Sequence, residues 1–316
     1  MMRVVITGGA GYIGSKVVEY ISSMRYNPTV VVVDNMMVGG EALIGQDITI
    51  IRADVRYRNE LKSALKDADF VIHLAAIVGY PACDLDKDFT YDVNVTGTKN
   101  VVDLTPKDVP IVFCSTSSVY GEQDCKVTEE TTPNPLTCYG QTKLEAEQHV
   151  TRHNPFIIFR PAAAFGVSRK LRLDLLPNAL TYDAVTSNQI KLYESFAIRP
   201  FVHVLDFARI VASTVLGSLQ WNTIYNLGSS KLVITKMDLA IQICSLTGAN
   251  IEVVDGADLD RRNYDISFAR LDSQDCTCNL TLKYGVRQVI NAMPIVFNAE
   301  EYTTPYYTKR FLNERL

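Results

Sequence analysis

The chain has 316 residues, of which 47% are hydrophobic, and a formal net charge of −4 at pH 7. This length and composition suffice for a large core, built as one big domain or as a domain with a smaller lobe. The absence of long like-charge runs argues against binding to nucleic acid or acidic membranes, and the absence of a signal peptide or a membrane-length apolar run predicts a cytoplasmic protein. The seven scattered cysteines contain no CxxC pair that would suggest zinc, so no metal site is expected.

Short apolar segments rich in β-branched residues recur through the first half of the chain, with helical segments between them. Segments that are apolar at successive positions suit strands of a parallel sheet that helices cover on both faces. The alternation therefore predicts an α/β fold with a doubly wound parallel sheet. Strands are expected at Val4–Ile6, Val30–Val33, Ile48–Ile51, Phe70–Ile72, Ile111–Phe113 and Phe156–Phe159, and helices at Tyr12–Met24, Glu60–Lys66, Phe89–Leu104 and Gln141–Arg152.

Three glycines, Gly8, Gly11 and Gly14, follow the first strand and open the first helix. Glycine permits a tight turn and lets a pyrophosphate approach the bare backbone, while the helix N-terminus offers unpaired N–H groups. Asp34 ends the second strand, where a carboxylate accepts hydrogen bonds from a ribose 2′-hydroxyl and repels a 2′-phosphate. The combination predicts a Rossmann-type site for NAD rather than NADP, with Asp54 within reach of the adenine amino group.

The regular alternation fades after Arg160, where prolines punctuate mixed helical and loop segments. Residues 1–165 are therefore predicted to form the NAD-binding domain, with additional core elements near 200–228. Residues 166–316 are predicted to form mainly a smaller, substrate-binding lobe, and its aromatic and charged end, EYTTPYYTKRFLNERL, is expected to be a docked tail.

The GxxGxxG spacing resembles the short-chain dehydrogenase/reductase superfamily, in particular its extended branch of nucleotide-sugar epimerases and dehydratases. The segments VVDN, ADV, HLAA, VNVTGT, STSSVYG, YGQTK, RPFVHVLD and YNLGSS continue the resemblance in the family's order, as far as about residue 230. The resemblance implies an NAD-dependent enzyme that acts on a nucleotide-diphosphate sugar. It implies that NAD contacts Gly8, Gly11, Tyr12, Ile13, Gly14, Asp34, Asn35, Asp54, Val55, Leu74, Ala75, Ala76, Asn94, Tyr139 and Lys143.

Tyr139 and Lys143 are four positions apart and therefore share one face of a helix. A free tyrosine, with a pKa of about 10, is a poor base at neutral pH, but a neighbouring ammonium and a positive nicotinamide ring favour its phenolate form. Thr116 takes the place of the family's catalytic serine or threonine and would hydrogen-bond the substrate oxygen. These three residues would together oxidise a sugar alcohol while hydride passes to NAD.

Ser117 and Ser118 stand where dehydratases of the family carry an acidic pair. Neither serine can act as a carboxylic acid, so 4,6-dehydration is disfavoured. A 4-epimerase that works through a transient 4-keto sugar needs only Thr116, Tyr139 and Lys143, and so does a C4 dehydrogenase or reductase that releases the keto product. A non-catalytic NAD-sensing module is a third hypothesis, which the presence of both Tyr139 and Lys143 opposes.

Arg199 matches the family arginine that grips the nucleotide diphosphate, for which a planar guanidinium is well suited. Ser117, Ser118 and Asn178 complete the predicted substrate-binding set, and Arg169 and Arg172 are weaker candidates. Ala163 replaces the usual asparagine, which enlarges the pocket and weakens the case for UDP-galactose as substrate. The resemblance also implies a homodimer, through the Phe89–Leu104 helix and the helix that carries Tyr139.

Overall fold

The computed structural model describes residues 2–37, 43, 48–79, 82–169, 171–255 and 264–296. A seven-stranded sheet forms its centre, with the strand order β10-β6-β5-β4-β1-β2-β3, and every pair of neighbours is parallel. This confirms the predicted doubly wound sheet. The strands are β1 (Arg3–Thr7), β2 (Thr29–Asp34), β3 (Thr49–Arg52), β4 (Phe70–His73), β5 (Ile111–Cys114), β6 (Phe156–Pro161) and β10 (Thr223–Leu227).

Alternate residues of each strand enter hydrophobic clusters on opposite faces of the sheet. In β2, Val30 and Val32 pack on one face, whereas Val31 and Val33 pack on the other. This is why the strands read as continuous apolar runs. The first face is covered by α1 (Tyr12–Ser22) and α8 (Val204–Ser213), and the second by α2 (Arg58–Leu65), α5 (Gly97–Leu104) and α6 (Cys138–Val150).

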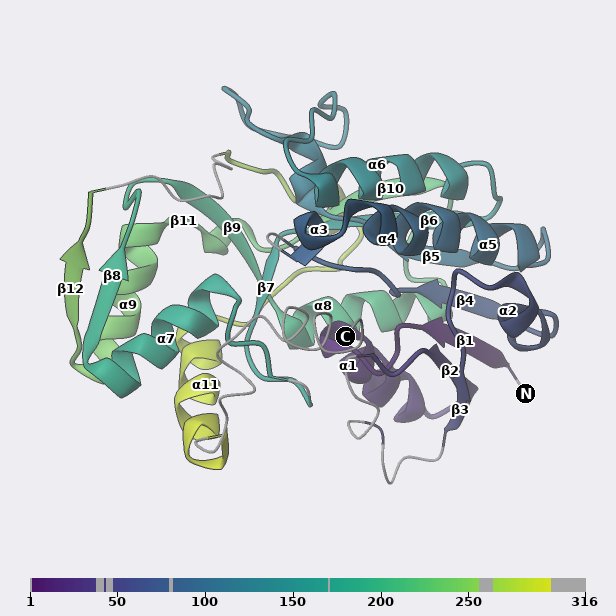
Figure 1. Cartoon of the computed structure of the whole chain (residues 1–316), viewed down its shortest axis with the longest axis horizontal. Helices are drawn as coiled ribbons and strands as arrows, with labels where there is room; N and C mark the ends of the chain where they lie inside the picture. Colours follow the sequence, from purple (N-terminus) through teal and green to yellow (C-terminus); the bar gives the residue numbers. More distant parts are fainter. Residues whose placement is uncertain are drawn as a thin grey trace.

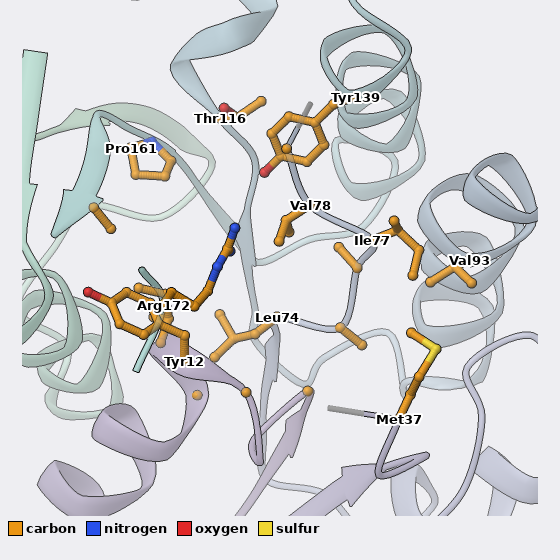
Figure 2. Close-up of a pocket in the computed structure, with 18 of the residues that line it drawn as sticks. Tyr12, Met37, Leu74, Ile77, Val78, Val93, Thr116, Tyr139, Pro161 and Arg172 are labelled. Carbon is orange, nitrogen blue, oxygen red and sulfur yellow. The ribbon is translucent and has the colours of Figure 1, made fainter. Parts of the chain in front are cut away.

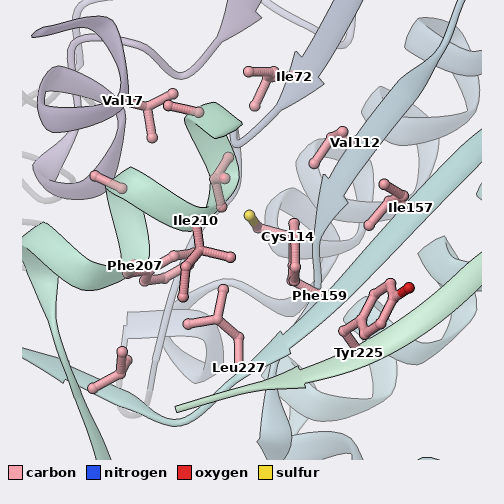
Figure 3. Close-up of a cluster of buried hydrophobic side chains, with 14 of the residues drawn as sticks. Val17, Ile72, Val112, Cys114, Ile157, Phe159, Phe207, Ile210, Tyr225 and Leu227 are labelled. Carbon is pink, nitrogen blue, oxygen red and sulfur yellow. The ribbon is translucent and has the colours of Figure 1, made fainter. Parts of the chain in front are cut away.

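Figure 3 shows the core beneath α1 and α8, where helix side chains meet the strands. Val17 of α1 and Phe207 and Ile210 of α8 belong to the same buried cluster as Ile72 and Val112 of the sheet. Although α8 and β10 follow residue 166 in the sequence, they complete this half of the molecule. Residues from both halves of the chain therefore build the core on this face of the sheet.

The predicted helix Phe89–Leu104 is divided into three pieces. These are α4 (Lys87–Tyr91), a π-helical turn η2 (Asp92–Thr96) and α5. Such π turns occur mostly as single turns inside α-helices, frequently at functional sites. The turn carries Asn94, one of the residues that the family resemblance assigns to cofactor binding.

Most of the remaining elements form a smaller lobe on the opposite side of the molecule from β3 (Figure 1). Its three-stranded sheet has the order β11-β9-β7, and β12 pairs with β8 in a two-stranded sheet. No described helix is both long and apolar enough to cross a membrane, and the predicted docked tail lies outside the described residues. The lobe contains β7 (Ala163–Phe165), α7 (Leu176–Ser187), β8 (Gln189–Leu192), β9 (Ile198–His203), β11 (Val233–Thr235), α9 (Lys236–Thr247), β12 (Asn250–Val253) and α11 (Leu282–Val296).

Candidate active site

A cavity of about 290 Å³ opens at the carboxyl ends of the central strands. It spans the point where the strand order reverses between β1 and β4, which is the place where open α/β sheets bind their ligands. Figure 2 shows Tyr139 and Thr116 on one wall, and Tyr12, Leu74 and Arg172 across from them. The predicted site residues that line it are Gly8, Gly11, Tyr12, Ile13, Gly14, Asp34, Asn35, Asp54, Val55, Leu74, Ala75, Ala76, Thr116, Ser117, Ser118 and Tyr139.

The glycine turn leaves no room for side chains between β1 and α1. Gly8 has a φ of +71°, and a Cβ there would lie 2.6 Å from the backbone nitrogen of Ala75. A Cβ on Gly14 would collide with the carbonyl oxygen of Gly8. Backbone therefore forms this part of the cavity wall beside the N-terminus of α1, an arrangement that fits the pyrophosphate of a dinucleotide.

Asp34 lies at the end of β2, on the cavity wall. Its Oδ2 accepts a hydrogen bond from the backbone nitrogen of Ala10 at 3.0 Å, and its Oδ1 accepts one from Met36 at 2.9 Å. These bonds fix the carboxylate, although burial raises its pKa above the ordinary value. The position and charge of Asp34 suit a ribose diol and oppose a 2′-phosphate.

Asp54 forms the neighbouring part of this wall and is held by Arg56 through two hydrogen bonds of 3.0 and 2.9 Å. Burial opposes ionisation of Asp54, but the hydrogen bonds from Arg56 outweigh it and lower the pKa of the carboxyl. Asn35 donates to the same carboxylate at 3.1 Å. Hydrogen bonds therefore hold both carboxylates at this end of the cavity in position.

Asn94 does not line the cavity, but it supports the wall from behind. Its side chain exchanges hydrogen bonds with both backbone groups of Ile77, at 2.8 and 3.0 Å, and donates to the Thr142 hydroxyl at 3.1 Å. Ile77 lines the cavity and Thr142 lies on α6. Asn94 therefore fastens the loop after β4 to the helix that carries Tyr139.

Thr116 is the N-cap of a short 3₁₀ turn, η3 (Ser117–Tyr120), directly after β5. Its hydroxyl accepts from the Ser118 nitrogen at 3.1 Å and donates to the Ser118 hydroxyl at 3.0 Å. Tyr139, in the first turn of α6, directs its hydroxyl into the cavity beside Thr116 (Figure 2). The phenol therefore has the Thr116 hydroxyl beside it in the cavity wall, with Val78 on its other side (Figure 2).

Lys143 lies on α6 one turn after Tyr139 and is almost completely buried. It is not among the residues that line the cavity, and its ammonium lies 4.0 Å from the centre of the Phe113 ring. Burial lowers the pKa of Lys143 to about 8, against opposing contributions from Cys114, Glu147 and Cys83. The Lys143 ammonium is therefore held behind the cavity lining, one helical turn from Tyr139 and against an aromatic ring.

His73, from the HLAA segment, closes the floor of the site. Its ring nitrogens bond the hydroxyls of Thr7 at 2.6 Å and Thr98 at 2.9 Å, and its ring stacks on Phe113. Burial, assisted by the charge of Lys143, lowers the pKa of His73 to about 3. The imidazole is therefore neutral and joins β1, β4 and α5 beneath the cavity.

Two predicted substrate-binding residues lie away from the cavity lining. Asn178 is fully buried in α7 and bonds the backbone of Gly166 and Arg172, and Arg199 is buried in β9. Arg172, by contrast, extends its guanidinium into the cavity (Figure 2), and Ala163 contributes to the wall. The sequence reasoning did not assign cavity-lining roles to Val33, Met37, Ala53, Ile77, Val78, Gly79, Val93, Thr137, Pro161, Ala162, Ala164, Leu175 and Phe207.

Most of those missed residues are apolar and line the cavity through their place in the fold, so no motif marks them. Ile77, Val78 and Gly79 continue the HLAA segment, whose position after a strand was the one available signal. Leu175 reaches the cavity from the start of α7, outside the predicted motifs, and Phe207 reaches it from α8, directly after the RPFVHVLD segment. Among the described residues, no group of three or more acids, histidines and cysteines is arranged to hold a metal ion.

The switch-point cavity, the glycine turn, the strand-end acid and the paired tyrosine and lysine define a dinucleotide-dependent enzyme of the oxidoreductase type. The comparisons make this more specific. The chain belongs to the NAD dependent epimerase/dehydratase family, whose model matches residues 4–228. Membership confirms the predicted resemblance to the nucleotide-sugar enzymes of this type and confirms NAD as the cofactor.

Similar proteins span most of the chain. A Methanocaldococcus jannaschii protein provisionally named UDP-glucose 4-epimerase is 30% identical over 241 residues, covering 72% of this chain and 77% of that one. The UDP-glucose 4-epimerase of Corynebacterium glutamicum is 27% identical, with 72% and 75% covered. The structure of dTDP-glucose 4,6-dehydratase from Bacillus anthracis, in complex with NAD, has a TM-score of 0.80 at 24% identity and covers 96% of this chain and 99% of that one. At that identity the structural likeness supports the fold.

Proposed function

We propose that the protein is a nucleotide-diphosphate sugar 4-epimerase that works through a transient 4-keto sugar. The observation that carries the proposal is the chemistry around Tyr139. The described wall there presents the hydroxyls of Thr116, Ser117 and Thr137, whereas the carboxylates among the described lining residues are Asp34 and Asp54, at the opposite end. Loss of water from C5 and C6 needs a positioned acid, which this wall does not offer, whereas C4 oxidation and reduction do not.

Each catalytic side chain has one task in this proposal. The Tyr139 phenolate takes the proton of the sugar C4 hydroxyl, and the Thr116 hydroxyl holds that oxygen. Lys143, buried one helical turn from Tyr139, is proposed to favour the phenolate electrostatically. Bound NAD supplies the hydride acceptor and donor for C4. Return of the proton from Tyr139 completes the inversion after the keto sugar has presented its other face.

Support for a nucleotide sugar comes from the similar proteins, since the relatives are named for UDP-glucose. The hydroxyls of Ser117 and Ser118, which line the cavity, are proposed to contact it. Ala162, Ala163 and Ala164 line the cavity with small side chains. Because Ala163 stands in place of the usual asparagine, the sugar is proposed to bind without an amide contact at this position.

The test combines one variant with product analysis. Purified protein is incubated in deuterated buffer with a panel of UDP-, GDP- and TDP-sugars, and products are followed by NMR. Inversion at C4 without solvent deuterium supports the proposal, and Tyr139→Phe should abolish it while NAD binding is kept. A lasting 4-keto product identifies a C4 dehydrogenase instead, deuterium at C3 or C5 identifies enolisation, and no turnover with any sugar favours a sensing module.

A homodimer through α4, α5 and α6 is also proposed, on the family resemblance. Two apolar side chains near this surface, Leu85 and Tyr91, are more than 40% exposed in the single chain. Tyr91 donates to Glu145 of α6, which joins the two helices into one face. Sedimentation should give twice the 35.2 kDa chain mass, and a monomer at micromolar concentration would contradict the dimer.

A further inference from the structure

Helix α1, which begins at the glycine turn, is fastened to a distant segment of the small lobe. We call this segment the clasp and define it as residues 166–169 and 171–174. Tyr12 donates its hydroxyl to the carbonyl of Gly166 at 2.8 Å, and the Ser168 hydroxyl donates to the carbonyl of Tyr12 at 2.6 Å. Ser15 bonds the Ser168 hydroxyl at 3.0 Å, and Arg169 forms an ion pair with Glu19.

These contacts lie on one face of α1, because positions 12, 15 and 19 are spaced by one turn each. Burial raises the pKa of the Tyr12 hydroxyl, so it stays protonated and acts as the donor to Gly166. Asn178 holds the clasp from the lobe side. Its amide bonds both backbone groups of Gly166, at 2.9 and 3.2 Å, and the carbonyl of Arg172 at 2.9 Å.

The clasp thereby carries Arg172 to the cavity. Figure 2 shows its side chain rising beside Tyr12, with the guanidinium between Leu74 and the wall that holds Tyr139. Nε and Nη2 donate to the two carboxylate oxygens of Asp174, which fixes the plane of the guanidinium. Arg172 is the only cation among the described residues that line the cavity.

Arg172 and the glycine turn line the same cavity, and the Arg172 side chain rises beside Tyr12 at the start of α1. A phosphate between the guanidinium and the turn would therefore meet donors on both sides. The glycine turn and the N-terminus of α1 offer backbone N–H groups from one side, and Arg172 offers charged donors from the other. We infer that Arg172 binds the pyrophosphate of the dinucleotide, and that the clasp retains NAD through turnover. Retention suits an epimerase, because the hydride taken from C4 returns to the same sugar, but the inference does not depend on which sugar reacts.

The test measures cofactor binding without turnover. Arg172→Met should weaken NAD and ADP-ribose by about 10–100-fold, the range for hydrogen bonds to charged groups, and should raise the dissociation rate of NADH followed by fluorescence. Binding of adenosine and UDP, measured by calorimetry, should stay unchanged. Arg172→Lys keeps the positive charge but loses the planar guanidinium, so its NAD affinity should lie between those of the wild type and Arg172→Met. If Arg172→Met fails to fold, Arg172→Lys takes its place in the test.

Two further variants distinguish the effect of the Arg172 guanidinium on NAD binding from the effects of the clasp contacts and of net charge. Tyr12→Phe removes the bond to Gly166 while Arg172 is kept, so NADH should leave faster with a smaller loss of affinity. Arg58→Met breaks an exposed pair with Asp103 and should change neither quantity. Unchanged NAD affinity in the Arg172 variants would overturn the inference. Loss of UDP affinity with NAD affinity intact would do the same, since it would assign Arg172 to the substrate diphosphate.

Discussion

Glu147 of α6 and Arg160 of β6 form a two-pronged ion pair that is almost completely buried. The Nε–Oε1 distance is 3.0 Å, the Nη2–Oε2 distance is 2.6 Å, and the remaining Nη1 donates to the Tyr120 hydroxyl at 3.1 Å. Glu147 lies one turn after Lys143 and two turns after Tyr139 on the same helix, so the pair fixes this part of α6.

Breaking this pair from one side should be costly. Arg160→Met leaves the Glu147 carboxylate buried without its partner, so the free energy of unfolding, measured by urea denaturation, should fall by about 3–5 kcal/mol. The double variant Glu147→Gln, Arg160→Met removes the lone charge and should recover much of that loss. Arg58→Met, which breaks an exposed pair, should cost less than about 1 kcal/mol. Equal costs in the buried and exposed variants would contradict the assigned role.

Lys143 should lower the free energy of unfolding at neutral pH, although turnover requires it. Burial lowers its pKa from 10.5 to about 8, so below pH 8 the folded chain carries a penalty of roughly 3 kcal/mol for the buried ammonium. Lys143→Met should therefore unfold at higher denaturant than the wild type at pH 7, while losing turnover. Between pH 8 and 10.5 only the unfolded wild type still binds the proton, so its stability rises and the difference should close.

The exposed Lys66→Met provides the control for that experiment, and its unfolding free energy should follow the wild type at every pH. A Lys143→Met variant less stable than the wild type at pH 7 would show that packing against Phe113 outweighs the cost of burying the charge.

Gly14→Ala should damage both folding and cofactor binding. The new methyl group would collide with backbone, namely the Gly8 carbonyl, and cannot be relieved by turning a side chain. We expect a loss of about 1–3 kcal/mol in unfolding free energy, together with greatly weakened NAD binding. Gly217→Ala, at a φ of +70° with open space around it, should cost about 1 kcal/mol and leave NAD affinity as it was. Normal NAD affinity in Gly14→Ala would contradict the proposed cradle.

Asp34 should determine the choice between NAD and NADP. Asp34→Ser removes a carboxylate that opposes the 2′-phosphate, so NAD affinity should fall by about 10–100-fold and NADP should bind relatively better. Because burial raises the pKa of Asp34, NAD affinity should also decline at a less acidic pH than for an exposed aspartate. Calorimetric titrations of both cofactors at several pH values test this, with the exposed Asp67→Ser as control. An unaltered NAD to NADP ratio would be the contrary result.

Much of the fold could be predicted because local patterns decide it. The predicted strand Val30–Val33 lies within β2, and the predicted helix Tyr12–Met24 overlaps α1 closely. The start of α6 was placed too late, at Gln141, because Thr137 caps a helix that begins at Cys138. The π turn inside the predicted helix Phe89–Leu104 depends on the bonds of Asn94 to another loop, which no local pattern contains.

Site residues could be predicted where they directly follow a strand or begin a helix. They could not be predicted where their position depends on hydrogen-bond partners far away in the sequence. Thr116 and Tyr139 reach the cavity through short local segments after β5 and at the start of α6. The sequence predicts that Asn178 contacts substrate, yet its amide hydrogen-bonds backbone groups of Gly166 and Arg172. Tertiary hydrogen bonding of this kind carries no signature in the sequence.

The bond between Tyr12 and Gly166 spans 154 positions of the chain. An amino-terminal fragment that stops before residue 166 would carry the whole phosphate-binding glycine motif, yet it would lack the groups that close over it. With Arg172 on the dinucleotide, as we infer, ligand binding should stabilise the carboxyl-terminal lobe as well as the sheet. NAD should then raise protease resistance and slow amide exchange in the lobe, although its adenosine end is proposed to bind in the other half of the protein.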